Sequence, residues 1–168
     1  MKNPELLDKK AKGKKLIEMK VMGMSMMKQV VTEKGGYASQ QGQRKDFSGD
    51  ELKEQQADAT PFPELTMVSK AGLVLDGIES YNGSEAYVIK DGNSTMYFDV
   101  NSGYKLGEVN EMKGEDGQKA SQTVNFSDYT DVKGIKVPYK MTMSVGIDIE
   151  LNTTDVKFNE GVKDTDFQ

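Results

Sequence analysis

A chain of 168 residues suits one domain with one sizeable core, and 36% hydrophobic residues mixed with charges of both signs predict a thin, sheet-based core. The net charge of −5 argues against a sequence-independent nucleic-acid binder, which needs a basic surface. Histidine and cysteine are both absent, which excludes a Ser-His-Asp triad, a cysteine nucleophile, a Cys/His zinc site and a disulfide. We therefore predict no catalytic residues, no metal site, no cofactor and no enzymatic activity.

Residues 1–14 are expected to form an N-terminal helix or an edge segment. Asn3 can cap a helix, Pro4 suits the first helical position, and Gly13 can end it. This region lacks the apolar run of an export signal, and nowhere does the chain approach the roughly 20 apolar residues that cross a bilayer. The sequence fits a cytosolic protein, a mature form or a domain of a longer chain, and does not choose among them.

In the next segment, residues 15–32, apolar and polar residues alternate as they do in a β-strand. The alternation changes phase near Met22 and Gly23, which predicts a turn or bulge there, because a shift of one residue exchanges the two faces. A short strand is expected over residues 37–41. Ser48 and Glu51 have the spacing of a capping box, so residues 49–59 are predicted to be helical.

The rest of the chain is predicted to be a series of short strands joined by tight turns. Asn82-Gly83 is the strongest hairpin signal. The expected strands cover residues 66–75, 78–81, 85–90, 94–100, 104–112, 119–129, 135–145 and 147–151. The predicted fold class is mainly β within α+β. It is a single domain over residues 1–168, with a curved antiparallel sheet or incomplete barrel and one or two short helices on the concave side.

The alternation of apolar and polar residues is clearest in residues 135–145. One face carries Val137, Tyr139, Met141 and Met143, and the other carries lysine and threonine. The apolar set is expected to face the core or the concave side. The many carboxylates, Glu108 among them, are expected on solvated strand faces or at turns.

Methionine is unusually frequent, with 11 residues, several of them between residues 19 and 27. Strands more often use β-branched residues, whereas methionine adapts its shape and is over-used at surfaces that accept varied apolar ligands. Two interpretations stay open: methionine as core filler, or methionine as the lining of a ligand cavity.

Several motifs occur in an order that resembles a known family. They are Gly83-Ser84-Glu85-Ala86-Tyr87-Val88-Ile89, Met96-Tyr97-Phe98-Asp99-Val100-Asn101-Ser102-Gly103, Phe126-Ser127-Asp128-Tyr129, Gly134-Ile135-Lys136-Val137-Pro138, and Phe158-Asn159 with Phe167. Over roughly residues 15–167 the chain resembles the outer-membrane lipoprotein-sorting (LolA/LolB-like) proteins of Bacteroidetes-type bacteria. The middle, from Gln41 to Asp46 and from Pro61 to Leu65, resembles the version of this domain appended to insulinase-like zinc proteases.

This resemblance implies an incomplete antiparallel barrel that carries a lipid or a lipoprotein acyl chain in the periplasm or cell envelope. An alternative is a non-catalytic scaffold or interaction domain of a larger envelope protein, such as an insulinase-like zinc protease. The partner is then an apolar ligand or another domain of the parent protein. The residues predicted to line the apolar cavity are Met19, Met22, Met24, Met26, Tyr87, Met96, Phe98, Tyr139, Met141 and Met143.

Overall fold

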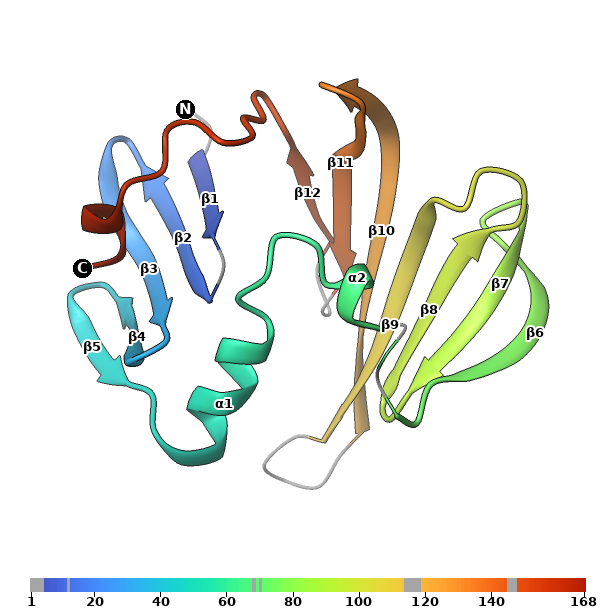
Figure 1. Cartoon of the computed structure of the whole chain (residues 1–168), viewed down its shortest axis with the longest axis horizontal. Helices are drawn as coiled ribbons and strands as arrows, with labels where there is room; N and C mark the ends of the chain where they lie inside the picture. The colour runs from blue at the N-terminus through green and yellow to red at the C-terminus, as the bar shows by residue number, and fades with distance from the viewer. Residues whose placement is uncertain (1–4, 12, 68, 70, 114–118, 145–147) are drawn as a thin grey trace. The chain divides into compact units, whose positions relative to one another are not determined.

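Two antiparallel sheets make up most of the molecule (Figure 1). The computed structural model describes residues 5–11, 13–67, 69, 71–113, 119–144 and 148–168. Contacts divide the chain into two compact units. The first unit comprises Met1–Val68 with Asn159–Gln168, and the second comprises Ser69–Phe158.

The first unit is built on a five-stranded sheet. Its strands, in order across the sheet, are β1 (Glu5–Ala11), β2 (Lys14–Val21), β3 (Met24–Thr32), β4 (Gly35–Gln40) and β5 (Gln43–Asp46). Met22 and Gly23 join β2 to β3 with φ of 53° and 82°, the pattern of a tight hairpin turn. The predicted turn at Gly23 is therefore confirmed, whereas strand β5 was not predicted.

The first unit has three short helical segments, two of which, α1 and η1, pack on opposite faces of this sheet. They are α1 (Gly49–Ala57), α2 (Glu64–Met67) and the 3₁₀ helix η1 (Asp164–Phe167). The helix predicted over residues 49–59 is present as α1. It packs against β3 and β4, where Gln56 donates a hydrogen bond to the Thr32 carbonyl at 2.9 Å. On the opposite face, Phe167 of η1 packs with Leu16 and Val30 to form the buried core of the unit.

Two secondary-structure predictions are wrong, one for the N-terminal segment and one for the segment that joins the two units. Residues 5–11 form strand β1 and not a helix. A helix of that length is marginal without packing, whereas β1 gains a complete ladder of hydrogen bonds with β2. The strand expected over residues 66–75 is also wrong, because Glu64–Met67 is helical and the next strand begins only at Val74.

A seven-stranded sheet forms the second unit. Its strands are β6 (Val74–Tyr81), β7 (Ser84–Asp91), β8 (Ser94–Asp99), β9 (Lys105–Lys113), β10 (Lys119–Val132), β11 (Ile135–Ser144) and β12 (Asp148–Asn152). Each pairs with its neighbour in the chain, and β6 and β12 are the edges. Neither sheet closes on itself, so the prediction of a mainly β, antiparallel, incompletely closed fold with a short helix is confirmed.

The register of this sheet separates a polar face from an apolar one, because directly paired residues share a face and successive residues alternate. On the polar face, Tyr81 stacks on Tyr97 with ring centroids 4.0 Å apart and donates a hydrogen bond to the Asn125 side chain at 2.7 Å. The Tyr81 ring crosses the sheet above Gly107, which has no side chain to obstruct it. The aromatic pair thus depends on Gly107, the β9 residue that pairs directly with Tyr97.

Replacing Gly107 by alanine should displace this ring. The added Cβ would lie 2.7 Å from two ring carbons of Tyr81, closer than side-chain carbons approach in folded proteins. We expect G107A to lower the free energy of unfolding by about 1–3 kcal/mol, measured by urea denaturation. Gly35→Ala is the matched control, since nothing lies within 4 Å of its Cβ position. Equal stability of the two variants would contradict the placement of Tyr81.

Carboxylates hold two turns of the second unit. Asp99 accepts hydrogen bonds from the Ser102 backbone N–H at 2.7 Å and from the Ser102 hydroxyl at 2.7 Å. These bonds lower the pKa of the Asp99 carboxyl below its ordinary value. Asp131 accepts the Gly134 backbone N–H at 2.9 Å in the same manner, and its pKa is also lowered.

Acid should therefore weaken the fold. A carboxyl whose pKa is lower in the folded state stabilises the protein above its unfolded pKa of about 3.9, and this contribution is lost as the pH falls through the folded pKa. We expect Asp99→Asn to be less stable than the unmodified protein at pH 7, with the difference shrinking towards pH 3. Thermal unfolding across this range measures it, and a difference that does not vary with pH would contradict the role of the charge.

Candidate functional site

The apolar face of the seven-stranded sheet is the candidate site, and two rows of side chains define it. The first row crosses all seven strands through directly paired residues. Its members, from β6 to β12, are Leu75, Ile89, Met96, Glu108, Val124, Met143 and Ile149. Neighbouring strands lie about 4.8 Å apart, so six steps span roughly 29 Å. Glu108 is the one residue of this row that is not apolar.

A second row runs beside the first and is also interrupted only at β9. On one side Ile78, Tyr87 and Phe98 are paired in succession, and Phe98 pairs with Lys105. On the other side of β9 the row continues with Phe126, Met141 and Leu151. The Lys105 ammonium lies 5.5 Å from the centre of the Phe126 ring, which joins the two halves. Tyr139 and Val137 extend the same face along β11.

The ends of this face are accessible, whereas Met96 near its centre is only 5% exposed. Among the described residues of the second unit, the large hydrophobic side chains that are clearly exposed are Val74, Leu75, Ile78, Tyr87, Met112 and Ile149. All of them except Val74 point to the apolar face. Leu75 is 65% exposed and Ile78 55% exposed. The described residues of the second unit form strands and no helix, so no helix of that unit covers the face. An exposed apolar patch of this kind is typical of a ligand or partner site.

One ion pair lies within the apolar face. The Lys105 ammonium donates a hydrogen bond to Glu108 Oε2 at 2.5 Å, and the Ser94 hydroxyl donates to Glu108 Oε1 at 3.0 Å. The side chains of Lys105 and Glu108 are only 15% and 24% exposed. The Tyr129 hydroxyl donates to the Lys105 carbonyl at 2.7 Å and fixes the backbone of β9 at this point.

Electrostatics keep the Glu108 carboxyl ionised. Burial raises the pKa of the Glu108 carboxyl, but the hydrogen bond and positive charge of Lys105, with hydrogen bonds from Ser94 and Asn110, lower it more, so the net pKa is below its ordinary value. Glu108 is therefore a carboxylate at neutral pH. The apolar face offers a positive and a negative group side by side at its central strand.

The first unit carries a smaller apolar surface. Met19 on β2 pairs with Leu6 on β1 and with Met27 on β3, and Met24 shares their face. Met24 is 63% exposed. Helix α1 occupies the other end of the same face, where Lys15 donates a hydrogen bond to Gln55 at 3.3 Å.

The structure thus divides the ten predicted site residues into three groups. Six of them share the apolar face of the second unit: Tyr87, Met96, Phe98, Tyr139, Met141 and Met143. Met19 and Met24 share a face of the first unit. Met22 lies in the exposed β2–β3 turn, and Met26 is the extra residue of a bulge, where its carbonyl accepts the Gln41 N–H at 3.0 Å.

Sequence reasoning missed Lys105 and Glu108. Glu108 was expected on a solvated face, but the structure places it within an apolar row. The register shift beside Tyr97 and Phe98 explains the error. It makes Leu106 an extra residue and places Lys105 and Glu108, three residues apart, on the same face, so alternation in the sequence does not identify the inner face of β9.

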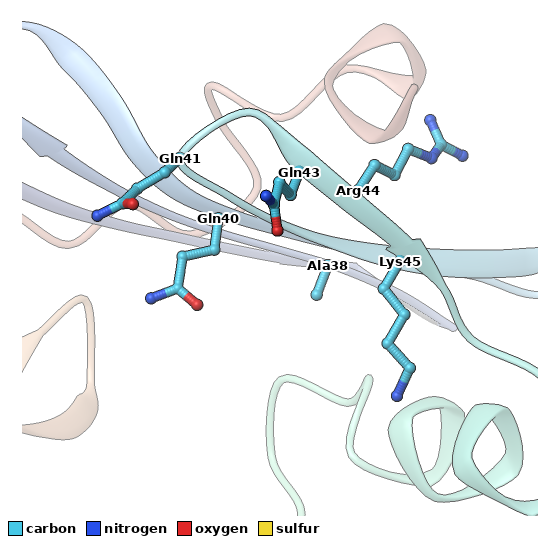
Figure 2. Close-up of a pocket in the computed structure, with 6 residues that line it drawn as sticks. All are labelled: Ala38, Gln40, Gln41, Gln43, Arg44 and Lys45. Atoms are coloured by element: carbon cyan, nitrogen blue, oxygen red, sulfur yellow. The ribbon is translucent and has the colours of Figure 1, made fainter.

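A separate polar hollow of about 440 Å³ lies on the β4–β5 hairpin of the first unit (Figure 2). It is lined by Ala38, Gln40, Gln41, Gln43, Arg44 and Lys45. The two long cationic side chains extend in different directions in the close-up, and they do not converge on one point. Lys45 forms an ion pair with Glu51 of α1 at 2.8 Å, which gives it a structural role.

Two further features of the described residues bear on the kind of site. Within the part of the chain that the structure describes, no group of three or more metal-ligating side chains comes together. No helix among the described residues has the length and apolar character needed to cross a membrane.

Comparison with known proteins identifies the fold. No protein-family model and no curated protein sequence matches the chain. A solved DUF1329 family protein from Desulfovibrio piger matches with a TM-score of 0.62 and 13% identity, over 92% of this chain and 75% of that one. A solved LolA superfamily protein from Nitrosomonas europaea matches with a TM-score of 0.58 and 12% identity, over 94% and 77% of the two chains. At these identities the likeness concerns the fold alone, and the fold is LolA-like.

Proposed function

We propose that this protein is a non-catalytic module of the cell envelope that binds a lipid or the acyl chain of a lipoprotein. The single observation that carries the proposal is the pair of apolar rows across the seven-stranded sheet, with Leu75 and Ile78 exposed at one end and Ile149 at the other. The LolA-like fold supports the same ligand class. We infer a location in the periplasm or cell envelope on this basis, and fractionation of the natural host with an antibody against the protein tests it.

Physical chemistry favours an elongated apolar ligand over a compact one. The rows are long and narrow, and a flexible hydrocarbon chain can lie along several strands at once. Methionine and aromatic side chains dominate the centre of the face, at Met96, Phe98, Met141 and Met143. Methionine re-packs around ligands of different shape, which suits acyl chains of varied length. Each buried methylene of the ligand contributes about 0.8 kcal/mol.

A second candidate function is that of a scaffold that docks another domain of a larger envelope protein, such as a protease. The same exposed apolar surface favours it, because protein partners also bury such patches. The two candidates differ in what accompanies the purified protein. Native mass spectrometry of the protein expressed alone in bacteria should show bound lipid under the first candidate and unliganded protein under the second.

A matched pair of substitutions on β6 tests the site. Leu75 and Val74 are neighbours and both exposed, but Leu75 points to the apolar face and Val74 to the polar face. We expect Leu75→Glu to weaken binding of a fluorescent fatty-acid analogue at least about tenfold, because one charge placed against an acyl chain costs more than 1.4 kcal/mol. Val74→Glu should leave affinity within about twofold of the unmodified protein.

Circular dichroism and urea denaturation should show both variants folded, since neither side chain is buried. Saturable binding that Leu75→Glu and Val74→Glu impair equally would place the ligand elsewhere. A folded protein that binds neither the fatty-acid analogue nor co-purified lipid would exclude the carrier function and leave the scaffold function.

Methionines of the first unit allow a corresponding test. Met24 shares an apolar face with Met19, whereas Met22 lies in the adjacent turn. We expect Met24→Glu to weaken binding of the fatty-acid analogue if this face contacts ligand, with Met22→Glu as the control. Titration of both variants measures it, and equal affinities would restrict the site to the second unit.

A further inference from the structure

We propose that the ligand is a single lipid with a zwitterionic headgroup, and that Lys105 and Glu108 bind the headgroup while the apolar rows bind the acyl chains. This inference rests on the proposed function and specifies its ligand. It is carried by the position, burial and bonding of the two charged side chains.

Their position is the first argument. Strand β9 is the central strand of the seven, with three strands on each side. The two apolar rows are interrupted at this strand alone, by Glu108 in the first row and Lys105 in the second. A headgroup held at β9 therefore has apolar side chains on both sides of it, as far as Ile78 in one direction and Leu151 in the other.

The energetics of the pair are the second argument. Two charges that are 15% and 24% exposed have lost much of their hydration, and their attraction offsets that loss only in part. Replacing such a pair by apolar side chains of similar volume is often neutral or stabilising. Such a pair is weak evidence for a role in stability, whereas recognition of a charged ligand would account for both side chains.

Bonding capacity is the third argument. An ammonium group has three N–H donors, and the hydrogen bond to Glu108 uses one of them. A carboxylate can accept about four hydrogen bonds, and Lys105, Ser94 and Asn110 supply one each, which leaves capacity for a further donor. A phosphate can thus bind beside Lys105 while an ammonium binds beside Glu108. A purely anionic or uncharged headgroup would satisfy only one of the two side chains or neither.

Three lipids with the same acyl chains test the proposal: dioleoyl phosphatidylethanolamine, which is zwitterionic, dioleoyl phosphatidylglycerol, which is anionic, and dioleoyl glycerol, which is uncharged. Each competes with the fluorescent fatty-acid analogue for the intact protein. We expect the zwitterionic lipid to compete about tenfold more strongly than the uncharged one, the ratio that a single charge-assisted hydrogen bond can supply. The anionic lipid should rank between them.

Two variants separate the headgroup contacts from folding. In Lys105→Met with Glu108→Met no charge is left unpaired, so the double variant should fold as well as the unmodified protein. It should bind all three lipids alike, with the affinity for dioleoyl glycerol unchanged or higher. Glu108→Gln keeps Lys105 and removes the negative charge, so it should prefer the anionic lipid to the zwitterionic one.

The outcomes distinguish this inference from the function on which it rests. If no lipid competes and none co-purifies, the proposed function fails and this inference with it. If the three lipids bind equally to the unmodified protein, or if the preference survives in the double variant, the protein binds acyl chains and the headgroup inference alone is overturned. An inverted preference in Glu108→Gln with a lost preference in the double variant would support it.

Discussion

The hydrogen-bonded register of the seven-stranded sheet is the constraint on which the second unit depends. Paired residues share a face, so the position of each hairpin turn decides which side chains join the apolar rows. The Asn82–Gly83 turn, with φ of 50° and 86°, fixes Tyr87 opposite Ile78. A slip of one residue at this turn would move Tyr87 from the apolar face to the polar face of the sheet. Both apolar rows would then be broken at β7. The candidate site is therefore a consequence of backbone pairing more than of any one side chain.

The two sheets differ in how their apolar side chains are buried. In the first unit, α1 packs on one face, and Phe167 with Leu16 and Val30 forms a core on the other. In the second unit the polar face is closed by its own tyrosines, and Ala86 and Val88 are fully buried beneath them. No helix among the described residues of the second unit packs on its apolar face. The unit thus leaves apolar side chains exposed at the margins of this face, among them Leu75, Ile78 and Ile149.

Much of the fold could be predicted from the sequence because tight turns and period-two alternation are local signals. The Asn82–Gly83 hairpin, helix α1 and the apolar face of β11 follow from residues close together in the chain. The N-terminal segment could not be predicted, because capping residues favour a helix there and only pairing with β2 makes it a strand. Lys105 and Glu108 were missed because the register shift at β9 has no signature in composition. The sequence of a strand predicts which side chains face the ligand only where apolar and polar residues alternate without a bulge.

The last ten residues return to the first sheet, and this makes the first unit discontinuous in the chain. Lys9 pairs with Asp166 at 3.0 Å across 157 residues, and Tyr37 donates to the Gln168 carbonyl at 3.2 Å. The second unit, in contrast, is one uninterrupted stretch of hairpins. Contacts between distant residues form slowly because a long loop must close first. During synthesis on the ribosome, the second unit can therefore pair its strands while the first still lacks Phe167, and the core around Leu16 is completed only when Phe167 emerges.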